Sequence, residues 1–135
     1  MKTIVIDLDG TLTQEGTGTS YKDVLPRPEV IAKLREYAEA GFRIAIYTAR
    51  NMRTHKNNVG VITALTAPVV IECLDRHQVP YDELHVGKPW CGDGGFYVDD
   101  KAIRPSEFTR LDAEQIQALI RAEAEILRPQ AETQG

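Results

Sequence analysis

The sequence has few cysteines and no long apolar run. Cys73 and Cys91 are its two cysteines, too few for a disulfide framework, and their spacing does not resemble that of a zinc site. The apolar stretch at residues 3–6 ends at Asp7, so it is too short for a signal-peptide core or a membrane span. We therefore expect a cytoplasmic protein with reduced thiols and no membrane contact.

Basic residues are not in excess either. The chain has 16 Lys and Arg against 20 Asp and Glu, and its formal net charge is −4. Since nucleic-acid backbones favour a basic protein face, this composition argues against a nucleic-acid partner. The sequence also lacks repeats and low-complexity tracts, and 135 residues suit one domain. We expect a single domain at 1–127 and a disordered tail at 128–135.

Short β-branched runs alternate with helical stretches along the chain. Buried strands are expected at 3–8, 43–48, 83–86 and 96–98. Helices are expected at 28–40, over a stretch that is interrupted near Pro68 and ends near His77, and at 112–127. This order predicts an α/β fold with three layers, Rossmann-like, in which helices cover both faces of a mainly parallel sheet.

The connection before the last expected strand departs from this pattern. The stretch between Lys88 and Asp99 contains Gly92, Gly94 and Gly95, and it is too short for a helical crossover. Either one of the last two strands is displaced, or the connection is an extended loop.

Polar residues close each of the four expected strands. They are Asp7 with Asp9, Thr48, Lys88, and Asp99 with Asp100. Each alone has an ordinary structural explanation as a turn, a helix cap or a solvated lysine. Ligands of parallel sheets bind beyond the carboxyl ends of the strands, so their shared position indicates one site.

The first pair suits covalent catalysis at phosphorus. Residues two positions apart on a strand share a face, so Asp7 and Asp9 can address the same substrate. One carboxylate can attack phosphorus and form an aspartyl-phosphate. The other can protonate the leaving alkoxide and then deprotonate water.

The remaining strand-end residues suit the charge of a phosphate. A divalent cation with oxygen ligands is needed to offset repulsion between carboxylates and substrate, and Asp99 and Asp100 can supply ligands together with Asp7. Lys88 and Thr48 can hold the non-bridging oxygens of the phosphate.

The four strand ends resemble the signatures of haloacid dehalogenase-like hydrolases. The matching segments are Asp-Leu-Asp-Gly-Thr-Leu at 7–12, Ile-Tyr-Thr at 46–48, Gly-Lys-Pro at 87–89 and Val-Asp-Asp at 98–100. The resemblance implies Asp7 as nucleophile, Asp9 as acid and base, and Thr48 and Lys88 as phosphate holders. It also implies Mg²⁺ bound by Asp7, the backbone carbonyl of Asp9, and Asp99, with Asp100 beside them. Dehalogenase members lack the second aspartate of the first signature, so Asp9 points to phosphate chemistry.

A narrower resemblance concerns the substrate. Segments 48–52, 87–92 and 98–105 are similar to small phosphatases of bacterial capsule and surface-polysaccharide biosynthesis. This implies a phosphorylated sugar or polyol as the small-molecule partner. The gaps between the signatures are too short for a cap domain, so the resemblance implies a capless enzyme.

An open site needs another cover that excludes water. Candidates are the loop at 11–22 and a polar segment that follows Thr48. This segment holds Arg50, Asn51, Arg53, His55 and Lys56, whose cations can bind a sugar carboxylate or a second phosphate. Arg50 and Asn51 lie closest to Thr48 in the chain and are the substrate-binding candidates. A neighbouring subunit of a homo-oligomer is a third candidate.

Other functions stay open. A phosphatase acting on nucleotides or nucleic-acid ends can use the same signatures, and a sugar phosphomutase would pass the phosphoryl group back to its sugar. An inactive binding protein on the same fold is the non-enzymatic alternative. The joint presence of Asp7, Asp9, Thr48, Lys88 and Asp99 speaks against the last of these.

Overall fold

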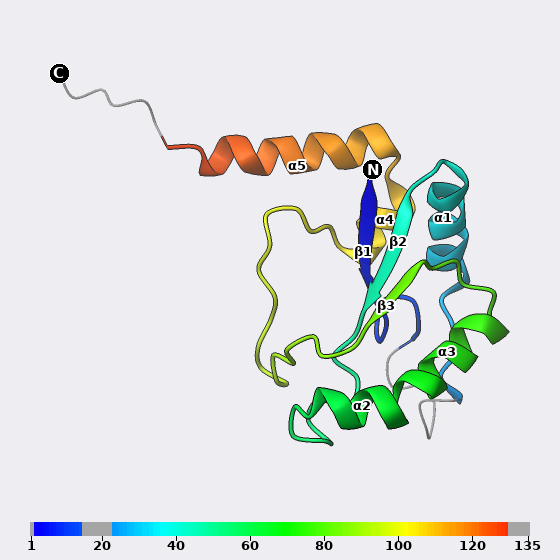
Figure 1. The fold of residues 1–135 in the computed structure, drawn as a ribbon. Coiled ribbons are helices and arrows are strands. Elements are labelled where there is room, and N and C mark those ends of the chain that lie inside the picture. Colours follow the sequence, from blue (N-terminus) through cyan, green and yellow to red (C-terminus); the bar gives the residue numbers. More distant parts are fainter. Residues whose placement is uncertain (1, 15–22, 130–135) are drawn as a thin grey trace. The chain divides into compact units, whose positions relative to one another are not determined.

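The computed structural model describes residues 2–14 and 23–129 (Figure 1). The chain divides into two compact units, Met1–Asp93 and Gly94–Gly135, and each is described here by itself. The expected single domain at 1–127 stays a prediction. Residues 130–135, most of the expected tail, lie outside the described residues.

The first unit is a parallel sheet with helical crossovers. Its elements are β1 (Thr3–Asp7), α1 (Pro28–Glu39), β2 (Arg43–Tyr47), α2 (Val59–Leu65), α3 (Ala67–Arg76) and β3 (Glu83–His85). The strands lie side by side in the order β1-β2-β3, and both pairs are parallel (Figure 1). Parallel neighbours need long connections, which α1 and the α2–α3 pair provide. The predicted α/β, Rossmann-like fold class is confirmed.

The core of this unit follows from strand alternation. Ile6, Ile44 and Ile46 are buried, whereas Val5 is 65% exposed. Since successive side chains point to opposite faces of a sheet, one face carries the apolar row. Leu34 of α1 and Leu74 of α3 are also buried, so the core lies between this face and the helices.

Local signals place the helices as expected. Pro28 begins α1, where its missing N–H costs no hydrogen bond. Pro68 stands in the first turn of α3 and separates it from α2, with Thr66 at the junction. The interruption near Pro68 and the helix end near His77 are both confirmed.

The second unit contains α4 (Pro105–Arg110) and α5 (Ala113–Leu127). A capping box begins α5, because Gln115 N donates to Asp112 Oδ1 at 2.8 Å and Asp112 N donates to Gln115 Oε1 at 2.9 Å. Helix α4 was not predicted. Its signal is local: Pro105 begins the helix, and Arg104 N donates to Glu107 Oε1 at 2.8 Å.

The predicted fourth strand at 96–98 is wrong in this structure. Residues 86–104 form neither strand nor helix, so the connection is the extended loop named as one of the two alternatives. Phe96 is 79% exposed and Val98 87%. A strand exists only where a neighbour completes its hydrogen bonds, and three apolar residues after two glycines do not specify such pairing.

Within residues 2–14 and 23–129, no helix is both long enough and apolar enough to cross a membrane.

Candidate active site

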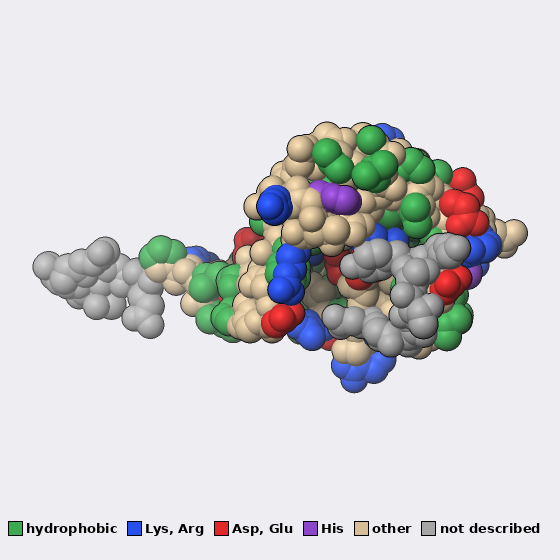
Figure 2. All heavy atoms as spheres, turned by 90° about the horizontal axis from the view of Figure 1, so that it is seen from below, with side chains coloured by type: hydrophobic (Ala, Val, Ile, Leu, Met, Phe, Trp, Pro, Cys, Tyr) green, Lys and Arg blue, Asp and Glu red, His purple; other side chains and the backbone are tan. Residues whose placement is uncertain are grey.

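The predicted site residues of the first unit meet at one edge of the sheet. Asp7 ends β1 opposite Tyr47, the last residue of β2, and Thr48 follows directly. Thr48 N donates to His85 O at 2.9 Å, and Lys88 N donates to Thr48 O at 3.1 Å. Parallel pairing therefore places Asp7, Thr48 and Lys88 next to one another. Acidic and basic side chains both reach the surface in the view from below (Figure 2).

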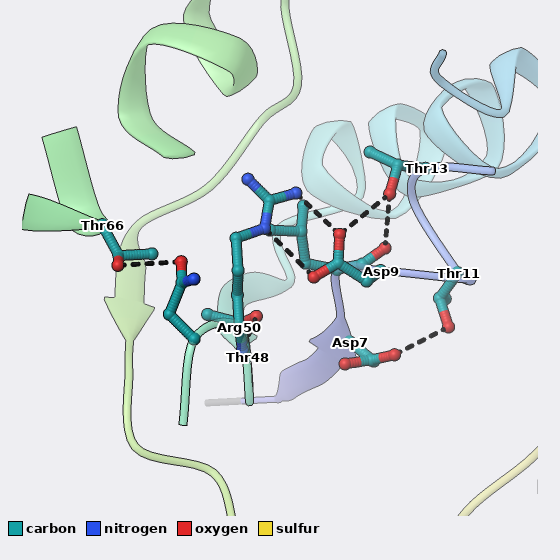
Figure 3. Close-up of polar contacts among 9 residues, drawn as sticks. Asp7, Asp9, Thr11, Thr13, Thr48, Arg50 and Thr66 are labelled. Atoms are coloured by element: carbon teal, nitrogen blue, oxygen red, sulfur yellow. Dashed lines mark hydrogen bonds and ion pairs between the residues drawn. The ribbon is translucent and has the colours of Figure 1, made fainter. Parts of the chain in front are cut away.

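Asp7 has a cationic and a hydroxyl neighbour. Lys88 Nζ lies 3.5 Å from Asp7 Oδ1. Thr11 Oγ1 donates to Asp7 Oδ2 at 3.3 Å (Figure 3). Partial burial raises the pKa of Asp7 above its ordinary value, and the positive charge of Lys88 opposes this rise. The result is a partly dehydrated carboxylate beside an ammonium group, an arrangement suited to attack on an anionic substrate.

The turn after β1 controls where Asp9 points. Leu8 O accepts hydrogen bonds from the N–H groups of Thr11, Leu12 and Thr13, at 3.2, 2.9 and 3.1 Å. Asp9 therefore lies in a turn beyond the strand, and its carboxylate is directed at Arg50 (Figure 3). Because β1 ends at Asp7, strand alternation does not set the direction of Asp9, and the expectation that both carboxylates reach one substrate stays a prediction.

Arg50 contacts Asp9. Its Nη2 lies 2.6 Å from Asp9 Oδ1, its Nε donates to Asp9 Oδ2 at 3.1 Å, and its side chain is 0% exposed. Arg50 N also donates to Thr48 Oγ1 at 3.0 Å, so the Thr48 hydroxyl keeps its hydrogen for a further acceptor. Sequence reasoning placed Arg50 among the substrate-binding candidates and missed this ion pair, since no local spacing links residues 41 positions apart.

Asn51 faces a different neighbour. Its Oδ1 accepts a hydrogen bond from Thr66 Oγ1 at 3.0 Å, at the junction of α2 and α3. Further along this turn, the Arg53 guanidinium lies 5.4 Å from the centre of the Trp90 ring. Substrate binding by Asn51 stays a prediction, as does a covering role for Arg53, His55 and Lys56. Of the other candidate cover, residues 11–14 belong to the described turn and 15–22 lie outside the described residues.

The predicted magnesium ligands are divided between the two units. Asp7 and the backbone of Asp9 belong to the first, and Asp99 and Asp100 to the second. Asp99 Oδ1 accepts a hydrogen bond from Lys101 N at 2.9 Å. In the described part of the chain no three His, Cys, Asp or Glu side chains gather at one point. The Asp7 carboxylate and the Asp9 carbonyl have the oxygen chemistry that Mg²⁺ prefers, and the predicted ligand set stays a prediction.

The chain is similar to several solved structures, although no family model and no curated protein matches it. A D,D-heptose 1,7-bisphosphate phosphatase from B. bronchiseptica with magnesium and phosphate shares 16% identity over 70% of this chain and 54% of its own, with a TM-score of 0.47. The Pnkp1/Rnl/Hen1 RNA repair complex shares 17% identity over 81% of this chain and 30% of its own, with a TM-score of 0.45. Likenesses this weak carry no argument about activity.

A structural-genomics target from Vibrio cholerae is far more similar. Its crystal structure shares 57% identity over 91% of this chain and 99% of its own, with a TM-score of 0.89. The chain therefore belongs to the same protein family as this Vibrio cholerae protein.

Proposed function

We propose that the protein is a Mg²⁺-dependent phosphomonoesterase of the haloacid dehalogenase-like type. Its proposed substrate is a phosphorylated sugar or polyol of capsule or surface-polysaccharide biosynthesis. The observation that carries the proposal is the environment of Asp7. A partly buried carboxylate stands at the carboxyl edge of a parallel sheet, with Lys88 Nζ 3.5 Å away and Thr48 on the adjacent strand end. This combination suits a nucleophile that works beside groups for an anionic substrate.

The proposed reaction divides one difficult displacement into two. A carboxylate oxygen of Asp7 attacks phosphorus, the ester bond breaks, and an aspartyl-phosphate forms. Asp9 gives a proton to the departing alkoxide and later removes one from the attacking water. Lys88 and the Thr48 hydroxyl donate hydrogen bonds to the non-bridging oxygens, where charge must be stabilised in the transition state.

Mg²⁺ is part of this proposal through its ligands. Asp7, the carbonyl of Asp9, and Asp99 would hold it, with Asp100 beside them. When bound, the ion would offset the repulsion between the Asp7 carboxylate and the phosphate dianion.

Phosphate release from a panel of phosphorylated sugars, polyols and nucleotides tests the function. Wild-type protein with Mg²⁺ should hydrolyse sugar or polyol phosphates, and Asp7→Asn should lose at least about a thousandfold in kcat. Asp75→Asn is the matched control, because Asp75 lies on α3 and contacts Tyr81 at 3.4 Å. Release from nucleotides alone would reject the substrate class, and full activity of Asp7→Asn would reject the mechanism.

A further inference from the structure

The Arg50–Asp9 pair is the most buried charged contact among the described ion pairs. The Arg50 side chain is 0% exposed, and two of its nitrogens contact the two carboxylate oxygens of Asp9, at 2.6 and 3.1 Å. A guanidinium and a carboxylate in this two-point geometry fix each other in orientation as well as in position (Figure 3). Thr13 Oγ1 also donates to Asp9 Oδ1, at 3.5 Å.

This geometry is unsuited to capture of an incoming substrate. A substrate-binding arginine needs exposed N–H groups directed at the ligand, whereas Nε and Nη2 of Arg50 are directed at Asp9 and its Nη1 is buried. The opposite charge of Asp9, 2.6 Å away, also offsets the charge of Arg50, so the pair attracts a distant anion only weakly.

The carboxylate of Asp9, in contrast, needs a neighbour that fixes its orientation. It lies in a turn beyond the end of β1 and not in the strand ladder. A short side chain in a turn has several rotamers, and a group that transfers protons must keep one orientation toward the reacting oxygen. The backbone of Arg50 is held in turn by Thr48, because Arg50 N donates a hydrogen bond to Thr48 Oγ1. The first two signature segments are thus linked through one side chain.

We propose that Arg50 is a positioning residue that fixes the carboxylate of Asp9, and that it does not bind the phosphate or the sugar. The proposal rests on the proposed function, in which Asp9 transfers protons. Arg50 acts through Asp9 and never touches the substrate. Its loss should therefore slow the chemical step and leave substrate affinity nearly unchanged.

Steady-state kinetics of Arg50→Gln and Arg50→Lys, each alone and combined with Asp9→Asn, test this role. We expect kcat to fall about ten- to a hundredfold with KM within about twofold, and more for an alkyl than for a nitrophenyl phosphate. In the Asp9→Asn background the Arg50 changes should add almost nothing. Arg43→Gln is the control, because it breaks the exposed contact of Arg43 with Glu83 at 2.6 Å, and it should leave both constants unchanged.

Three kinetic results would overturn the proposal. They are a rise in KM at constant kcat, losses that multiply with that of Asp9→Asn, and equal losses for the two substrates. Arg50→Lys keeps the charge but not the two-point geometry, so it serves where Arg50→Gln does not fold.

A measurement on folded protein separates this proposal from the proposed function. The NMR signal of Arg50 Nε–H should be protected from exchange. It should move in Asp9→Asn and stay in place when inorganic phosphate is added. A signal that moves with phosphate and not with Asp9→Asn would assign Arg50 to ligand binding and refute the proposal. Wild-type protein without phosphatase activity would refute the proposed function, and the NMR result would still decide whether Arg50 fixes Asp9.

Discussion

Substitution of Gly87 tests whether the backbone before Lys88 positions the site. Gly87 has φ +88°, and a Cβ added there would lie 3.1 Å from Val59 Cγ2. An L-residue in the left-handed region costs about 1–2 kcal/mol, so Gly87→Ala should destabilise by that amount and by somewhat more for the contact. Lys88 follows directly and bonds Thr48 O at 3.1 Å, so any shift of the turn moves its ammonium group relative to Asp7.

Gly41 provides a matched control. It has φ +96°, but a Cβ there would meet nothing within 4 Å, and it ends α1 away from the strand-end edge. Both Gly→Ala variants should therefore lose about 1–2 kcal/mol of stability, or roughly 4–8 °C in Tm for a chain of this length. Only Gly87→Ala should also lose activity, by about tenfold to a hundredfold in kcat/KM, because a misplaced catalytic group is costly.

The assay combines thermal melts with phosphate release for both variants and for Gly87→Ala with Val59→Ala. The double variant should recover the cost of the contact with Val59 and keep the backbone cost. If Gly87→Ala retained the activity of Gly41→Ala, the turn at Gly87 would not position Lys88, and the reasoning would fail.

Three further predictions address the metal, the proton transfer and a surface ion pair. Excess chelator should abolish phosphate release, and added Mg²⁺ should restore it. Ca²⁺ should not restore it, because Ca²⁺ prefers longer bonds and more ligands. Full turnover in chelator would contradict the metal requirement. Asp9→Asn should reduce single-turnover phosphorylation by a sugar phosphate far more than by an aryl phosphate, within roughly a hundred- to ten-thousandfold, and equal losses would exclude a general acid. Hydrogen bonds from Arg43 and then His85 lower the pKa of Glu83 below its ordinary value of 4.5. The stability advantage of wild type over Glu83→Gln should therefore be present above pH 4.5 and shrink as the pH falls through the lowered pKa, and a pH-independent difference in urea melts would refute the pairing.

Most of the first unit could be predicted from its sequence because its signals are local. The strand at Arg43–Tyr47 is a β-branched and apolar run, and Pro28 and Pro68 mark helix boundaries. The convergence of Asp7, Thr48 and Lys88 also follows from local information, since parallel strands end at the same edge of a sheet.

The rest depends on contacts between distant parts of the chain. The run at 96–98 has strand composition, but it forms no strand in this structure. Strand pairing depends on a neighbouring strand as much as on the run itself. The Arg50–Asp9 pair joins two signatures, and Asp9 lies in a turn that follows the end of β1 at Asp7. The periodicity of the sequence does not reveal where this strand ends. The turn after a strand sets the direction of its side chains. Residue spacing alone therefore could not show whether Asp7 and Asp9 reach the same substrate.

The most direct test of the account is to detect phosphate on Asp7. Asp9→Asn protein mixed with an aryl phosphate and Mg²⁺ should form phospho-enzyme faster than water removes it, because Asp9 is the proposed base for the second step. Acid quenching and peptide mass spectrometry should find one phosphoryl group on the peptide that contains Asp7, and none in Asp7→Asn. Continued phosphate release by Asp7→Asn, or a phosphoryl group on a different residue, would contradict the covalent role of Asp7.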